Sequence, residues 1–120
     1  MELPAVKLLI SLDIDGTMEF GDPPGPVTVK WVREAKNLGY IVGSSSDRPI
    51  SSQRRLWKEN DFDGIDFVML KHWMPKLKQM FKADEYWHIG DGDMDQLIAV
   101  QTGFEFFWAE SFPEDIKSWK

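Results

Sequence analysis

The sequence predicts an α/β fold: a three-layer α/β/α, doubly wound sheet of five parallel strands. Short apolar runs alternate with helix-like segments along all 120 residues, and no repeat, low-complexity tract or linker separates them. The first run, residues 8–12, is apolar with little alternation, which suits a central parallel strand that helices cover on both faces. Regular alternation of this kind is typical of a right-handed doubly wound sheet, whose site lies where the strand order switches.

Length and composition narrow the classes of function. With 120 residues, the chain is expected to be a single domain, 1–120, with a real core but no room for a second module. Because there is no cysteine, and only His72 and His88 as histidines, a metal ion would have to be hard and oxygen-ligated. The net charge of −6 argues against a broad nucleic-acid surface. No apolar run reaches the roughly 18 residues of a membrane span and no signal peptide is recognisable, so a cytoplasmic protein without a membrane partner is expected.

The first strand ends in two carboxylates, a glycine and a hydroxyl. Asp13 and Asp15 are two positions apart, so on an extended backbone both side chains leave the same face. At about 4 Å and an effective dielectric constant of roughly 20, their repulsion is on the order of 4 kcal/mol. Either one carboxyl group stays protonated or a cation lies between the two. Gly16 permits a tight exit beside a ligand, and Thr17 follows it.

A loop, a helix and a strand follow. The loop is rich in proline and glycine up to Pro26 and is long enough only for a flap. A helix is predicted over 27–38, with an apolar stripe that ends at Leu38, and a strand over 40–45. The serines that end this strand have a structural interpretation, because serine hydroxyls bond to nearby backbone groups in turns and helix caps.

The middle of the chain predicts two more helices with a strand between them. The first helix covers 50–60, and the strand covers 66–70 and ends at Lys71. Pro75 is expected to open the next helix at its first position. The side chains of that helix expected to face inward are Leu77, Met80 and Phe81.

The last third of the chain holds a second acidic cluster. A strand over 86–89 leads into Gly-Asp-Gly-Asp-Met-Asp, residues 90–95, and Asp93 is expected to cap the helix over 94–102. A fifth strand is predicted over 104–109, and residues 113–119 form a short terminal helix or an ordered tail.

Two of these segments resemble motifs of one family. Residues 13–17, Asp-Ile-Asp-Gly-Thr, are similar to the first motif of the haloacid dehalogenase (HAD) superfamily of Mg²⁺-dependent phosphotransferases. Residues 90–95 are similar to its fourth motif, Gly-Asp-Gly-x-x-Asp, although Asp93 stands where many relatives have an apolar residue. Between these motifs the family places a serine or threonine at the end of the second strand and a lysine before the fourth.

This chain offers two candidates for each of the intervening positions. Ser46 is the best match for the hydroxyl, because it precedes Arg48 as in the Thr-Gly-Arg-Pro of many relatives, but Ser-Asp-Arg-Pro departs from that pattern and leaves Ser45 open. Lys71 is favoured over Lys76 for the lysine by its place at a strand end. Arg48 could bind a phosphate or carboxylate bidentately, or could be a solvated arginine at a helix start.

The resemblance implies a capless (C0-type) HAD-like Rossmannoid core with strand order 5-4-1-2-3, holding Mg²⁺. The implied activity is a phosphomonoester hydrolase, in which Asp13 is the nucleophile that forms an aspartyl-phosphate and Asp15 is the general acid and base. Asp15 would have to titrate nearer neutrality than its partners. The implied site comprises catalytic Asp13, Asp15, Ser46 and Lys71, substrate-binding Gly16, Thr17 and Arg48, and the metal ligands Asp13, Asp15, Asp91 and Asp95.

Two alternative functions and the substrate class stay open at this point. A receiver-like signalling module fits less well, because it expects a lysine at the end of strand five, and a catalytically weak HAD-like protein for regulation or assembly is the other alternative. The expected substrate is a small phosphorylated metabolite or an exposed phosphate end, in preference to nucleic acid. A homo-oligomer could supply the missing lid. Trp73 or Trp108 could stack on the substrate, although aromatic residues more often fill cores.

Overall fold

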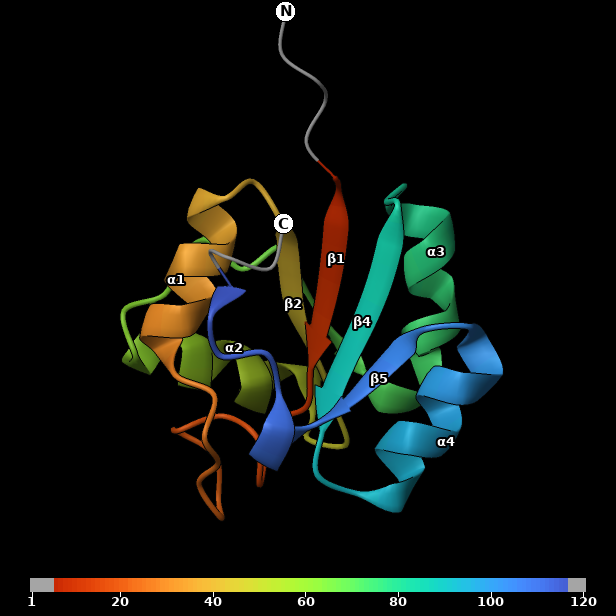
Figure 1. The fold of residues 1–120 in the computed structure, drawn as a ribbon. Helices are drawn as coiled ribbons and strands as arrows, with labels where there is room; N and C mark the ends of the chain where they lie inside the picture. The colour runs from red at the N-terminus through yellow and green to blue at the C-terminus, as the bar shows by residue number, and fades with distance from the viewer. Residues whose placement is uncertain (1–5, 117–120) are drawn as a thin grey trace, which may run out of the picture.

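The structure is a computed structural model that describes residues 6–116, and it contains one five-stranded sheet with helices on both faces (Figure 1). The strands are β1 (Leu8–Leu12), β2 (Ile41–Ser46), β3 (Phe67–Leu70), β4 (Glu85–Gly90) and β5 (Glu105–Trp108). The α-helices are α1 (Val29–Asn37), α2 (Ile50–Glu59), α3 (Leu77–Met80) and α4 (Asp93–Thr102). Two 3₁₀ helices, η1 (Lys71–Lys76) and η2 (Ala109–Ser111), follow β3 and β5.

All strand pairs in the sheet are parallel, which confirms the predicted class of fold. Counted from the β3 edge, the order is β3-β2-β1-β4-β5. The expected order, 5-4-1-2-3, was counted from the β5 edge, and both describe the same neighbours: β1 lies between β2 and β4. The central strand is therefore the one that carries the first acidic motif.

The side chains of β1 alternate between two apolar layers. Leu8, Ile10 and Leu12 belong to a cluster that includes Trp31 of α1 and Trp57 of α2. Leu9 belongs to a second cluster, which includes Leu77 of α3 and Ala99 of α4. Figure 1 shows α1 and α2 on one side of the sheet and α3 and α4 on the other. Because both faces are covered, all five residues of the strand are buried, as its largely apolar run predicted.

The third predicted helix is the element that differs most from expectation. Pro75 does not open an α-helix; it lies inside the 3₁₀ helix η1, and α3 has only four residues. Pro75 has no backbone N–H to donate to the carbonyl four residues earlier, so the segment from Lys71 winds as a 3₁₀ helix and the regular helix begins only at Leu77. Leu77 is buried as expected, but Met80 is 56% exposed, so its predicted inward orientation is wrong.

The remaining corrections concern the ends of elements. Leu38 lies beyond α1 and is 39% exposed, so it does not belong to the buried stripe. Asp93 is the first residue of α4 and not its cap, which is Gly92. Residues 113–115 form no helix, and 117–119 lie outside the described residues. None of the helices within residues 6–116 is long and apolar enough to cross a lipid bilayer.

Candidate functional site

The carboxyl ends of the parallel strands bring four of the expected residues to one hollow of about 390 Å³. Asp13 directly follows β1, Ser46 is the last residue of β2, and Lys71 directly follows β3. Asp91 directly follows β4. Because parallel strands end at the same edge of a sheet, residues far apart in sequence meet there. Asp15 and Asp95 also line this hollow, which we call the acidic hollow.

Three carboxylates in the acidic hollow are close enough to share a metal ion. Asp13, Asp91 and Asp95 each offer one carboxylate oxygen, and these oxygens lie within 4.8 Å of one another. Asp13 and Asp95 are buried, whereas Asp91 is exposed. Burial and the neighbouring Asp95 raise the pKa of Asp13 to about 7, so the cluster resists holding all its negative charge without a cation. Three carboxylate oxygens suit a hard divalent ion such as Mg²⁺.

Lys71 is the lysine that reaches this cluster. Its buried Nζ lies 3.1 Å from Asp95 Oδ1, 3.3 Å from Asp13 Oδ2 and 3.8 Å from Asp47 Oδ2. Burial alone would lower the pKa of Lys71, but the carboxylates of Asp13 and Asp95 outweigh burial and raise it. Lys76 is exposed, and its Nζ lies 4.9 Å from the centre of the Trp73 ring. The structure therefore brings Lys71, and not Lys76, to the predicted position.

The side chain of Asp15 is bound by an arginine instead of joining the three clustered carboxylates. Arg48 Nε lies 3.0 Å from both carboxylate oxygens of Asp15, and the backbone N–H of Asp22 donates to Oδ1 at 2.8 Å. Burial would raise the pKa of Asp15, but the hydrogen bonds from Arg48 and Asp22 lower it. The expectation that Asp15 titrates nearer neutrality is wrong for this state of the site, in which Asp13 has the raised pKa.

The two candidate serines have different surroundings. Ser46 lines the acidic hollow, and its Oγ accepts a hydrogen bond of 3.0 Å from the backbone N–H of Arg48. Ser45 is fully buried, and its Oγ accepts a hydrogen bond of 2.8 Å from Ser11. Ser46 is thus the serine that a ligand in the hollow could reach.

The two residues that follow Asp15 differ in their access to the site. Gly16 adopts φ +76°, and a Cβ at this position would lie 1.8 Å from Asp91 Oδ2, so only glycine fits. Thr17 is fully buried, and its hydroxyl has no hydrogen-bond partner among the described residues. Gly16 therefore allows Asp91 to approach the loop after β1.

Asp95 is held by a buried histidine, His88, which was not predicted to belong to the site. His88 Nε2 lies 2.7 Å from Asp95 Oδ1, and His88 Nδ1 lies 2.9 Å from Ser11 Oγ. Ser11, which donates to Ser45, is paired with His88 in the register of β1 and β4. The sequence signal for this contact was a serine in the otherwise apolar run of β1, together with a histidine in the segment that forms β4. Together these side chains form a polar line beneath the acidic hollow, which we call the Ser45–Ser11–His88 line.

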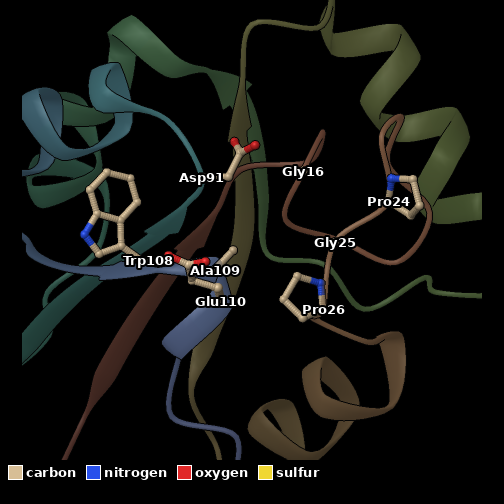
Figure 2. Close-up of a pocket in the computed structure, with 8 residues that line it drawn as sticks. All are labelled: Gly16, Pro24, Gly25, Pro26, Asp91, Trp108, Ala109 and Glu110. Atoms are coloured by element: carbon tan, nitrogen blue, oxygen red, sulfur yellow. The ribbon is translucent and has the colours of Figure 1, made fainter.

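A second hollow, of about 330 Å³, adjoins the acidic hollow and shares Asp91 with it. Figure 2 shows Pro24 and Pro26 on one side of this cavity and Trp108 on the other, at the end of β5. We call this cavity the Trp108 hollow. Trp73, the other tryptophan proposed for stacking, does not line it and is 43% exposed on η1.

Comparison of the chain with family models, curated proteins and solved structures finds no match. The geometry of the site is therefore what indicates a function. A cluster of carboxylates, a buried ammonium group and a reachable hydroxyl at one open hollow can bind a divalent cation together with an anion such as phosphate.

Proposed function

We propose that the chain is a Mg²⁺-dependent phosphomonoester hydrolase of the HAD type that works through an aspartyl-phosphate on Asp13. The observation that carries the proposal is the cluster of Asp13, Asp91 and Asp95, whose carboxylate oxygens lie within 4.8 Å of one another. Lys71 Nζ is 3.3 Å from Asp13, and Ser46 lines the same hollow. This is the set of groups that phosphoryl transfer requires: a nucleophile, donors for the phosphoryl oxygens and ligands for a cation.

The metal ligands would be the carboxylates of Asp13, Asp91 and Asp95. When bound, Mg²⁺ would supply positive charge that offsets the carboxylates and the phosphoryl oxygens. The side chain of Asp15 is assigned to proton transfer, because it lies against Arg48 and outside the group of three carboxylates.

The reaction has two displacements at phosphorus. In the first, an oxygen of Asp13 bonds to phosphorus while the P–O bond of the ester breaks, and the leaving oxygen takes a proton from Asp15. In the second, water loses a proton to Asp15 and bonds to phosphorus, which breaks the acyl-phosphate bond and releases inorganic phosphate. Lys71 and Ser46 stabilise charge on the phosphoryl oxygens.

We assign Arg48 a second partner during the reaction, the phosphate of the substrate. Its guanidinium group holds Asp15 ionised, and an ionised carboxylate cannot donate a proton to the leaving group. A substrate phosphate offers Arg48 a more highly charged partner. Transfer of Arg48 to that phosphate would free Asp15 to take up a proton.

The test is hydrolysis of para-nitrophenyl phosphate with Mg²⁺ and with EDTA. The wild type should release phosphate with Mg²⁺ and be silent in EDTA. Asp13→Asn should abolish turnover while it leaves the circular dichroism spectrum unchanged. The matched control is Asp93→Asn, which removes an exposed carboxylate that lines the same hollow but lies outside the group of three. Substantial turnover by Asp13→Asn would remove Asp13 from the nucleophile role.

A Mg²⁺- and phosphate-binding module without turnover is the second candidate. The contact between Arg48 and Asp15 favours it, because the expected general acid has a lowered pKa. In that case the wild type would bind Mg²⁺ and inorganic phosphate in a calorimeter but hydrolyse no ester. The same assay therefore separates the two functions.

A further inference from the structure

Of the residues that line the Trp108 hollow, the proposed chemistry gives a direct role only to Asp91. The Trp108 hollow opens beside the acidic hollow, and the two share Asp91, which stands at the end of β4. A phosphoryl group bound among the carboxylates would therefore have the Trp108 hollow directly next to it. In a phosphomonoester, the group next to the phosphoryl group is the leaving group.

The walls of the Trp108 hollow are largely apolar. Pro24, Gly25 and Pro26 form one side, from the flap after β1, and Trp108 and Ala109 form the other. The Trp108 ring packs edge to face on Phe106, with 4.8 Å between ring centres, so Phe106 helps to fix its orientation. Proline and tryptophan surfaces of this kind suit a flat ring better than a flexible polar chain. At about 330 Å³, the cavity is at the small end of ligand sites, which favours a single small ring system.

The charge of the Trp108 hollow disfavours one kind of leaving group. Its two ionisable residues are Asp91 and Glu110, and none of the described residues that line it carries a positive charge. A carboxylate or a further phosphate on the leaving group would be repelled by Glu110, whereas an uncharged group would not, and an amine would be attracted.

We propose that the Trp108 hollow is the leaving-group site of the phosphatase, and that it selects planar aromatic leaving groups without negative charge. The inference rests on the proposed function, because it needs a phosphoryl group in the acidic hollow. Trp108 supplies the surface on which the ring lies, and Glu110 supplies the discrimination against anions. Neither residue contacts the reacting atoms. Both are assigned to the choice of leaving group and not to catalysis.

The experiment compares four esters with Mg²⁺: phenyl phosphate, 4-carboxyphenyl phosphate, tyramine O-phosphate and ethyl phosphate. Each variant is compared with the wild type on the same ester, so that the intrinsic reactivity of the leaving group cancels. Trp108→Leu should raise KM for the three aryl esters about threefold to tenfold, as expected for loss of one aromatic contact, and should leave ethyl phosphate unchanged. Its matched control is Trp73→Leu, which should change none of the four.

Glu110→Gln tests the charge discrimination. The value of kcat/KM should rise about twofold to threefold for 4-carboxyphenyl phosphate and fall by a similar factor for tyramine O-phosphate, because an exposed charge acts through solvent. Phenyl phosphate should be unaffected. The matched control is Glu114→Gln, which is exposed outside the hollow. Equal changes for all four esters, or none, would overturn the role of Glu110.

Binding of phosphonates separates this inference from the proposed function. Calorimetry with Mg²⁺ should show that phenylphosphonate binds more tightly than ethylphosphonate, and that Trp108→Leu removes the difference. If the wild type hydrolyses none of the esters, the phosphatase proposal fails and the leaving-group assignment fails with it. If the wild type is active but phenylphosphonate binds no better than ethylphosphonate, the leaving-group assignment alone fails.

Discussion

At the scale of single residues, Asp13 has the most unusual environment in the site. Its pKa is raised to about 7, chiefly by burial and by Asp95, while Lys71 acts in the opposite direction. A raised pKa in the folded state means that folding favours the protonated acid. The resulting stabilisation is fully present below the unfolded value of 3.8 and is lost as the pH rises through about 7.

We therefore expect the metal-free protein to become less stable from about pH 4 to about pH 7. Asp13→Asn has no carboxyl group to ionise at this position, so it should remove most of this loss of stability. At about 1.4 kcal/mol per pKa unit, the loss amounts to a few kcal/mol at most. Urea unfolding in EDTA over this pH range measures the effect, and Asp93→Asn should behave like the wild type. An equal loss of stability in Asp13→Asn and the wild type would show that another group is responsible.

Lys71 supports a second prediction, because it lies against the two buried carboxylates of Asp13 and Asp95. Lys71→Met leaves them without their cation, so we expect the free energy of unfolding at neutral pH without metal to fall by roughly 3 kcal/mol. Lys76→Met removes an exposed charge and should change it by less than about 0.5 kcal/mol. Similar effects of the two substitutions in chemical denaturation would contradict the buried role of Lys71.

The residues of the site differ in how far sequence could predict them. Asp13, Asp91 and Asp95 belong to motifs with fixed spacing, and the structure brings them together. The partner of Asp15 could not be found in this way, because Arg48 is 33 positions away and its side chain reaches Asp15 only through the fold. The electrostatic environment of Asp15 was therefore misjudged from its neighbours in sequence alone.

At the scale of elements, the Ser45–Ser11–His88 line joins three strands through their buried side chains. Ser11 is its central member, since it contacts Ser45 of β2 and His88 of β4. Ser11→Ala would leave two buried polar groups without this partner, so we expect a loss of about 1–3 kcal/mol in the free energy of unfolding. Thermal and urea unfolding measure it, and Ser51→Ala, on the exposed part of α2, is the control. A loss no larger than that of the control would show that the line contributes little.

Regular elements were predicted well where burial follows a simple period. The helix expected over 27–38 is α1, Val29–Asn37, and the strand expected over 66–70 is β3, Phe67–Leu70. The stretch from Lys71 to Met80 was predicted poorly, because a proline in its middle changes the helix type and only part of it is buried. The spacing of apolar residues indicates which face of a helix is buried, but it does not distinguish a 3₁₀ turn from an α-helical turn.

At the scale of the whole molecule, metal binding should stabilise the fold. A ligand that binds only the folded state at 100 times its dissociation constant adds about 2.7 kcal/mol to the free energy of unfolding. We expect Mg²⁺ to raise the melting temperature of the wild type, and Asp91→Asn to abolish most of the increase without lowering the temperature measured in EDTA, because Asp91 is exposed. Asp93→Asn should keep the increase. An unchanged Mg²⁺ response in Asp91→Asn would remove that residue from the metal site.

All five strands place a residue of the acidic hollow or of the Trp108 hollow at their last position or just after it, while their buried faces hold the apolar layers together. This separation has a practical consequence for protein engineering. Glu110 of η2 is exposed, so its exchange could redirect the proposed choice of ester while the stability of the scaffold is largely insulated from the change; its neighbour Ala109 is buried in the core and would have to stay.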